Sequence, residues 1–198
     1  MSSVLLDMAI SLDGCIAGEN GDDPGLYDWY FAETSTDTTT FIKDELIGSI
    51  GAMILGKRAF GDDPNGFDTP YKIPHFVLSH EVRETVARDG MQYIFVTQGV
   101  EHALAQAKAA AGDKFVCVAG GAETARQFIE AGWLDEIQLH LVPVIVGNGL
   151  RLWGQAGAAW PKLEAIRVLE NEGVTHLRFR VIKDGDAHRT AAALTSEP

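Results

Sequence analysis

The chain has 198 residues, of which 46% are hydrophobic, a composition typical of one globular domain with a single apolar core. Its 28 acidic residues outnumber its 16 basic residues, and the resulting formal charge of -12 repels nucleic-acid phosphates and anionic membranes, so neither partner is expected. The chain has only two cysteines, Cys15 and Cys117, which suits a reducing compartment. No apolar run approaches the roughly 20 residues of a membrane-spanning helix, and the start of the sequence shows no targeting pattern. These features predict a cytoplasmic protein.

Over the first two thirds of the sequence, short apolar runs alternate with stretches of helical period, which is the order typical of layered α/β folds. A polar loop rich in glycine and aspartate follows the first run at residues 18–25, and its length indicates a functional loop. In chain order, this part predicts strand 4–10, helix 36–51, strands 52–55 and 75–78, a weak helix at 82–88, strand 93–96, helix 102–111, strand 115–119 and a helix between Gly121 and Gly132.

The last third changes to strict alternation of apolar and polar residues, which is typical of strands with two different faces. Alternation runs from residue 134 to 146, and two further alternating stretches, 162–169 and 174–182, are joined by a turn that contains Gly173. We therefore expect a mostly parallel sheet with an antiparallel C-terminal hairpin. A single domain is expected over residues 1–184, followed by a flexible tail over 185–198.

Three loops that follow predicted parallel strands carry residue types suited to phosphate, and open α/β sheets bind ligands at such strand ends. The first contains Gly56, Lys57 and Arg58. A glycine lets the backbone approach a ligand closely, and two adjacent cations attract phosphate. The alternative is a solvated turn whose charges serve solubility.

The second loop contains Ser79 and His80, which suit a ribose phosphate but equally suit a helix N-cap. The third runs from Gly120 to Thr124, where paired glycines precede a helix whose first amides can bind a pyrophosphate. Many helices begin after glycine, so this signal alone is weak. The three loops agree in type, order and strand position, which favours one nucleotide site.

Together with these loops, the remaining motifs resemble the dihydrofolate reductase-like superfamily, and within it the reductase domain of the bifunctional riboflavin-biosynthesis protein. The resemblance extends over residues 4–182 and rests on the segments SLDGCIA at 11–17, ILGK at 54–57, AGGA at 119–122, LDE at 134–136 and PVIVGNG at 143–149. It implies a three-layer α/β/α fold and an NADPH-dependent reductase. We expect hydride transfer to a small heterocyclic (pteridine- or pyrimidine-like) or carbonyl substrate.

The resemblance also assigns cofactor-binding roles. It implies that the loop at 18–25 acts as a lid and that the Gly120–Gly121 peptide can be cis. Gly56, Lys57 and Arg58 are expected to bind the adenosine phosphates, and Ser79 and His80 the ribose 2′-phosphate. The pyrophosphate is expected to lie on Gly120, Gly121, Ala122, Glu123 and Thr124. The nicotinamide is expected to lie beside Ala9, Ile16 and Ala17. No metal is expected, because the histidines and cysteines lack a metal-ligand spacing.

The reaction also needs a proton and a substrate surface, for which the sequence offers four candidates. Asp28 stands where folate-reducing relatives place a substrate-binding carboxylate, and Trp29 beside it offers an aromatic wall. Asp13 is a second candidate acid, although an Asp-Gly pair is commonly a turn. Asp63 resembles a substrate-side residue of the riboflavin branch.

Two expectations remain open at this point. His140 lies on an alternating strand and is expected to be a partly buried strand residue. The C-terminal strands are expected to form a homodimer surface. The alternative to an enzyme is an NADP(H)-binding sensor or scaffold homodimer that has lost turnover.

Overall fold

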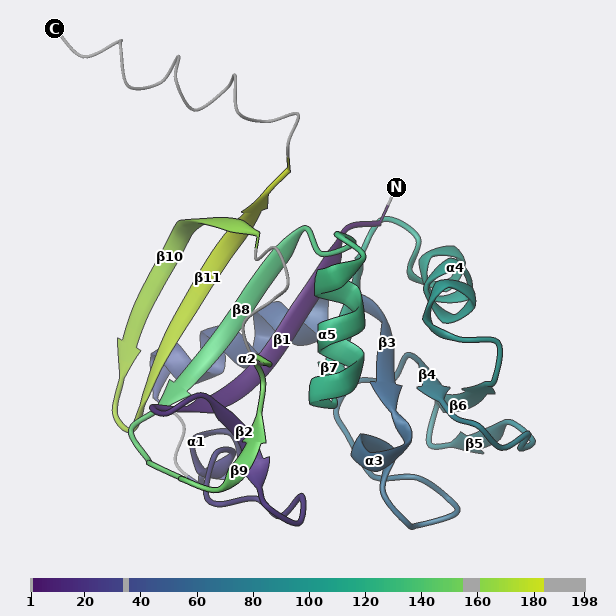
Figure 1. The fold of residues 1–198 in the computed structure, drawn as a ribbon, viewed down its shortest axis with the longest axis horizontal. Helices are drawn as coiled ribbons and strands as arrows, with labels where there is room; N and C mark the ends of the chain where they lie inside the picture. The colour runs from purple at the N-terminus through teal and green to yellow at the C-terminus, as the bar shows by residue number, and fades with distance from the viewer. Residues whose placement is uncertain (1, 34–35, 155–160, 184–198) are drawn as a thin grey trace, which may run out of the picture.

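The computed structural model describes residues 2–33, 36–154 and 161–183, so the predicted tail at 185–198 lies outside the described residues. A nine-stranded sheet forms the middle of the molecule, in the order β10-β11-β8-β1-β7-β3-β4-β6-β5, and β2 pairs with β9 beside it (Figure 1). The elements are β1 (Val4–Ser11), β2 (Cys15–Gly18), α1 (Asp28–Phe31), α2 (Asp37–Ser49), β3 (Ile50–Gly56), α3 (Lys57–Phe60), β4 (Pro74–Leu78), β5 (Val86–Arg88), β6 (Met91–Val96), α4 (Val100–Ala111), β7 (Phe115–Gly120), α5 (Ala122–Glu130), β8 (Glu136–Val142), β9 (Gly149–Arg151), β10 (Lys162–Asn171) and β11 (Val174–Ile182).

The strands from β8 to β6 in this order run parallel, and antiparallel pairing is confined to the two edges of the sheet. At one edge β10 and β11 form a long hairpin, and at the other β5 turns back on β6 (Figure 1). The prediction of a mostly parallel sheet with an antiparallel C-terminal hairpin is therefore confirmed. This is the α/β arrangement of dihydrofolate reductase-like folds.

Two apolar clusters hold helices against the two faces of the sheet, which makes three layers. The side chains of α4 and α5 pack on one face with Val4, Leu6 and Met8 of β1. Those of α1 and α2 pack on the other face with Leu5 and Ala9 of the same strand. A strand covered on both sides reads as a continuous apolar run, which is why β1 was easy to predict from sequence.

The helix predicted at 82–88 is wrong. Residues 79–85 are not helical, and Val86–Arg88 instead pairs with β6 through a two-residue turn at Asp89 and Gly90. Both turn residues have positive φ, 46° for Asp89 and 83° for Gly90. An Asp-Gly pair favours such hairpin turns, and that local preference overrode the weak helical pattern.

Candidate active site at the strand ends

Three neighbouring parallel strands, β7, β3 and β4, end at one edge of the sheet, and the loops that follow them line a single cavity of about 950 Å³. The structure therefore brings together the three predicted phosphate loops, and β2 adds a fourth wall. The cavity is lined by every predicted cofactor residue except Ala9, namely Ile16, Ala17, Gly56, Lys57, Arg58, Ser79, His80, Gly120, Gly121, Ala122, Glu123 and Thr124.

Glycines allow the β3 and β7 loops to approach each other closely. A Cβ placed on Gly120 would lie 2.7 Å from Cβ of Ala59, and one on Gly56 would lie 3.0 Å from Oγ1 of Thr124. Gly121 has a φ of 83°, which side chains rarely tolerate, and it precedes the first turn of α5. The Gly120–Gly121 peptide is trans, so the cis form that the resemblance allows is absent at this position.

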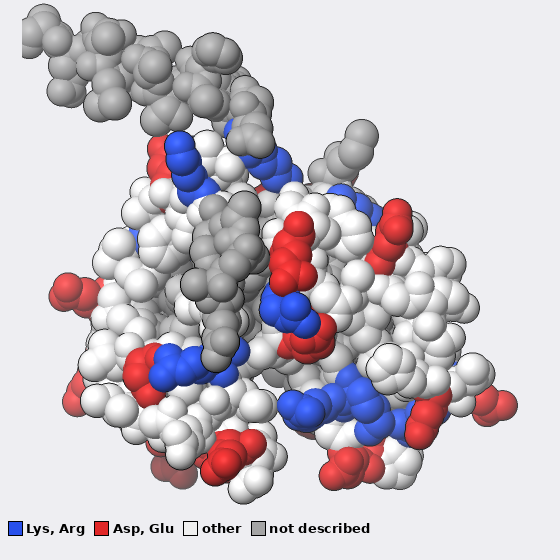
Figure 2. All heavy atoms as spheres, in the orientation of Figure 1, with Lys and Arg blue, Asp and Glu red and all other residues white. Residues whose placement is uncertain are grey.

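The basic pair stands at the mouth of this cavity. Lys57 Nζ donates to the carbonyl oxygen of Gly61 at 2.8 Å, which ties its ammonium group to the end of α3. Arg58 is exposed, and its Cδ lies 3.9 Å from the position of a Cβ on Gly21, so it reaches the predicted lid loop. Figure 2 shows Lys and Arg side chains gathered on this face over α3.

Two carboxylates also line the cavity, and sequence reasoning gave a role to only one of them. Glu123, in the first turn of α5, accepts from Arg126 at 2.5 Å and from Gln127 at 3.1 Å. Hydrogen bonding by Arg126 lowers the pKa of Glu123. The carboxylate is therefore paired within α5, and Arg126 compensates its negative charge beside a bound phosphate. Glu81 was not predicted; it follows Ser79, whose hydroxyl donates to its carbonyl oxygen and accepts from its amide, both at 3.0 Å.

Asp13 joins the turn after β1 to the loop after β8. Its carboxylate accepts from Ser11 Oγ at 2.6 Å and from the amides of Val146 and Gly147 at 3.1 and 2.8 Å. These hydrogen bonds, that of Ser11 first, hold the pKa of Asp13 well below its usual range. A carboxylate so stabilised is a poor acid, and Asp13 lies outside the cavity lining, so this geometry does not favour its predicted catalytic role.

The other predicted substrate residues also lie outside the cavity lining. Asp28 is exposed, and Trp29 is buried with its ring 4.6 Å from that of His140. Asp63 is exposed and holds its own turn by accepting from the amide of Asn65 at 2.8 Å. Ala9 points away from the cavity into the α1 and α2 face. These four residues are absent from the cavity lining, because the position of a motif does not fix the direction of a side chain.

Five further side chains line the cavity and had no predicted role. They are Met8, Tyr27, Phe31, Phe67 and Leu150. Tyr27 and Phe31 flank the predicted pair at 28 and 29, so the segment was found and the wrong residues of it were chosen. Phe67 carries no motif that marks it.

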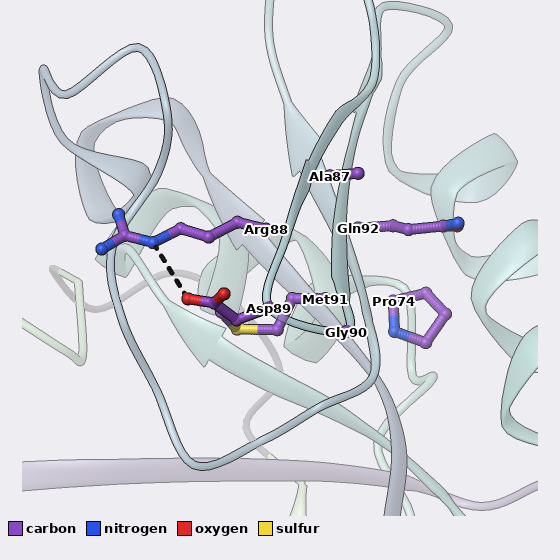
Figure 3. A pocket seen from close by; sticks show the side chains of 7 residues that line it. All are labelled: Pro74, Ala87, Arg88, Asp89, Gly90, Met91 and Gln92. Carbon is purple, nitrogen blue, oxygen red and sulfur yellow. Dashed lines mark ion pairs between the residues drawn. The ribbon is translucent and has the colours of Figure 1, made fainter.

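A second hollow of about 490 Å³ lies at the β5–β6 turn, beside Pro74 at the start of β4 (Figure 3). Arg88 lines this hollow; its Nη1 donates to the carbonyl oxygen of Gly66 at 2.7 Å, and its Nε lies 3.9 Å from Asp89. The guanidinium is thus already engaged. We place the candidate active site in the larger cavity.

Comparison with known families agrees with this geometry. Residues 2–177 match the family described as RibD C-terminal domain. The chain belongs to the RibD C-terminal domain family. Its dihydrofolate reductase-like fold and its likeness to the riboflavin-biosynthesis reductase domain are therefore confirmed.

Similar proteins agree with this fold and do not fix a substrate. YyaP of Bacillus subtilis, an uncharacterized protein, is 26% identical over 159 residues, which cover 76% of this chain and 79% of YyaP. The structure of a riboflavin biosynthesis protein from Shewanella sp. PV-4 superposes with a TM-score of 0.67 at 22% identity, covering 92% of this chain and all of that one. The structure of the deaminase and reductase protein of Thermotoga maritima superposes with a TM-score of 0.63 at 18% identity, covering 91% of this chain and 57% of that one. At these identities the two structures establish the fold alone.

No helix in the described ranges is long and apolar enough to cross a membrane.

Proposed function

We propose that this protein is an NADPH-dependent reductase that transfers hydride to a small heterocyclic or carbonyl substrate. The observation that carries the proposal is the convergence of the β3, β4 and β7 ends on one cavity, with Lys57 and Arg58 at its mouth. Family membership supports the same reaction class, because the related Thermotoga maritima protein is described as a reductase.

The strand ends suit the phosphates of the cofactor. Gly120 and Gly121 leave backbone exposed where α5 begins, and the first amides of that helix have no intrahelical acceptor. Lys57 and Arg58 supply positive charge in a protein of net charge -12. We assign the ribose 2′-phosphate to Ser79 and His80, which line the same cavity, together with the positive charge of Lys57 and Arg58.

The opposite end suits a flat ring. Met8, Ile16, Ala17 and Leu150 give this end apolar walls, which exclude water from a hydride transfer. NADPH, when bound, supplies the hydride from its reduced nicotinamide. The four side chains would hold the ring in place, and Asp13 would keep β2 in position through its hydrogen bonds to the loop after β8.

Paired titrations with NADPH and NADH test the phosphate assignment. Replacing Lys57 and Arg58 by Ala is expected to weaken the binding of NADPH by about tenfold to 100-fold and the binding of NADH by much less, because charge-assisted phosphate contacts are lost. Lys162→Ala, on the exposed start of β10, is the matched charge control. Equal weakening of both cofactors would contradict the phosphate assignment.

Consumption of NADPH separates an enzyme from a cofactor-binding sensor. We expect the purified protein to oxidise NADPH when it is offered pteridines, pyrimidines or quinones in turn, followed by the loss of reduced-nicotinamide absorbance. Binding without consumption across this set would favour the sensor.

We also propose that two copies pair through the C-terminal hairpin. On the edge strand β10, Leu163, Ile166 and Val168 are 42%, 38% and 56% exposed, an apolar row beside unpaired backbone groups. Sedimentation is expected to give a dimer in the wild type and a monomer in Val168→Glu. A wild-type monomer at micromolar concentration would contradict the pairing.

A further inference from the structure

The described residues that line the cavity divide into two groups. The residues at or after the ends of β3, β4, β6 and β7 include every Lys, Arg, Asp or Glu of this lining, namely Lys57, Arg58, Glu81 and Glu123. The residues outside these segments are Met8, Ile16, Ala17, Gly21, Tyr27, Phe31, Phe67 and Leu150. We call these eight residues the uncharged wall, because none of them carries a charged side chain.

Three aromatic side chains of the uncharged wall are free to contact a substrate. Our assignment of the nicotinamide uses the aliphatic and thioether side chains from β1, β2 and β9, which leaves Tyr27, Phe31 and Phe67. Phe31 is 76% exposed, although it is one of the largest apolar side chains of the chain. Aromatic side chains that line a cavity are typical contacts of flat ligands.

Trp29 anchors the helix that carries two of these aromatic residues. Its buried ring has its centroid 4.6 Å from that of His140 and 4.9 Å from that of His176. The Nδ1 atoms of the two histidines lie 2.7 Å apart, so the histidines form a pair beneath Trp29. Tyr27 and Phe31 flank Trp29 on α1 and its N-cap, so this packing holds them at the cavity.

Two hydrogen bonds hold the loop that carries the third aromatic residue. Tyr93 Oη donates to the carbonyl oxygen of Phe67, and Arg88 Nη1 donates to that of Gly66 at 2.7 Å. Gly66 has a φ of 75°, and a Cβ placed on it would lie 2.5 Å from the Tyr93 ring, so glycine is required here. The aromatic surface is therefore formed before a ligand binds, which reduces the entropy lost on binding.

The hydroxyl group of Tyr27 is a neutral hydrogen-bonding group in the uncharged wall. Burial, followed by the charges of Asp7 and Asp23, raises the pKa of Tyr27 to about 12. The phenol therefore keeps its proton at neutral pH and can donate it in a hydrogen bond to an acceptor oxygen. The same two carboxylates give this hydroxyl negative surroundings, which disfavour an anion beside it.

The cations on neighbouring elements have other partners. Arg151 Nη1 donates to the carbonyl oxygen of Asp13 at 2.7 Å, and Lys43 Nζ lies 4.8 Å from the ring centroid of Tyr30. The basic pair after β3 is assigned to the phosphates of the cofactor. A phosphate or carboxylate on the substrate would thus lose water without gaining a counter-charge from the described residues of the uncharged wall.

We propose that the substrate is an uncharged planar ring with a carbonyl group, which Phe31 and Phe67 contact and to which Tyr27 donates a hydrogen bond. This inference rests on the proposed reductase function and names its substrate class. The Thermotoga maritima protein is described as the reductase of a phosphoribosylamino-uracil, which carries a phosphate. The uncharged wall favours a different substrate for this chain.

Calorimetric titrations of the protein saturated with NADP⁺ test the proposal. The probes are coumarin and coumarin-3-carboxylate, which share one planar carbonyl ring and differ in charge. Bound NADP⁺ occupies the basic pair, so the probes report on the uncharged wall. We expect coumarin to bind at least about tenfold more tightly than the anion. Equal affinities, tighter binding of the anion, or no binding of coumarin would overturn the proposed substrate class.

Variants of Phe31 test whether the probes bind at the uncharged wall. Phe31→Ala is expected to weaken coumarin binding about two- to tenfold, because an aromatic contact is lost. Phe31→Lys supplies a cation and is expected to bind coumarin-3-carboxylate more tightly than the wild type does. The matched control is Phe41→Ala on α2, a 51% exposed ring outside the cavity lining, which should bind both probes like the wild type. Wild-type affinities for both probes in Phe31→Ala and Phe31→Lys would overturn the role of Phe31.

The affinity for NADP⁺ is measured first in each protein. Wild-type NADP⁺ affinity in the Phe31 variants shows that they are folded and that the phosphate loops are intact. No NADP⁺ binding by the wild type would overturn the proposed function. NADP⁺ binding together with a preference for the anionic probe would overturn the substrate class alone, so the two failures are distinguishable.

Discussion

The two ends of the cavity are built in different ways. At the phosphate end, the backbone forms the site: β7, β3 and β4 end at one edge of the sheet, and glycines allow their loops to approach each other closely. At the substrate end, side chains form the site, and they come from β1, β9 and the loops near residues 27 and 67. The first end depends on strand order and the second on side-chain direction. Mutations at the two ends should therefore fail in different ways.

The largest effect is expected from a side chain at the backbone end. Gly120→Val would place atoms where Cβ alone already approaches Cβ of Ala59 to 2.7 Å, so α3 must move. Overpacking of this kind typically costs 1–3 kcal/mol, and we expect NADPH binding to weaken by about 100-fold. Titration of the variant with NADPH measures this loss.

The matched control is Gly48→Ala in α2, where a Cβ meets nothing within 4 Å. We expect this helix substitution to stabilise the protein by about 0.5–1 kcal/mol and to leave NADPH binding unchanged. Wild-type affinity in Gly120→Val would contradict the close approach of the two loops.

The join between β2 and the loop after β8 should give the next largest effect. Asp13→Ala removes acceptors for Ser11 and for the amides of Val146 and Gly147. Because β2 carries two cavity residues, we expect NADPH to bind about tenfold more weakly, with a lower melting temperature. Asp13→Asn retains one acceptor oxygen, so its NADPH affinity and melting temperature should lie between those of the wild type and Asp13→Ala. A catalytic role would instead show as lost turnover at unchanged affinity.

The buried histidine pair predicts a pH dependence of stability. The pKa of His176 falls from 6.5 in the unfolded chain to about 4, so between these values only the unfolded state binds the proton. Stability from this group is therefore complete above about pH 6.5 and is lost as the pH falls toward 4. Between pH 7 and 5 the loss is about 2 kcal/mol.

Urea unfolding at pH 7 and pH 5 measures this loss. His176→Phe is expected to show a correspondingly smaller change in the free energy of unfolding between the two pH values. His102→Gln, on the exposed start of α4, is the matched control and should behave like the wild type. Equal pH dependence of His176→Phe and the wild type would show that His176 is not held neutral.

The smallest effect is expected at Asp63. Its carboxylate holds a turn in an exposed loop and lies outside the cavity lining. Asp63→Asn is expected to leave NADPH affinity and turnover within a factor of about two, since exposed substitutions usually change little. A loss of turnover of tenfold or more would return Asp63 to the substrate site.

This contrast also explains what the sequence could predict. Strand ends are visible as short apolar runs, and neighbouring parallel strands end at one edge. The sequence therefore predicted one shared site for Gly56, Ser79 and Gly120, and these residues line one cavity. The β2–β9 pair was missed, because each strand has only three or four residues and no clear alternation.

The substrate end was unpredictable for a different reason. Trp29 and Tyr27 are two residues apart, yet one is buried against His140 and the other lines the cavity. The partnership of His140 with His176 spans 36 residues and depends on the register of β8 against β11. Sequence reasoning correctly placed His140 on a strand, but the register that pairs it with His176 is set only when the sheet forms.

Isothermal titration of the wild-type protein with NADPH tests the central claim most directly. The geometry predicts one saturable site per chain, with a dissociation constant between about 1 μM and 1 mM and weaker binding of NADH. No detectable binding of NADPH at millimolar concentration would contradict the claim that the ends of β3, β4 and β7 form a dinucleotide site.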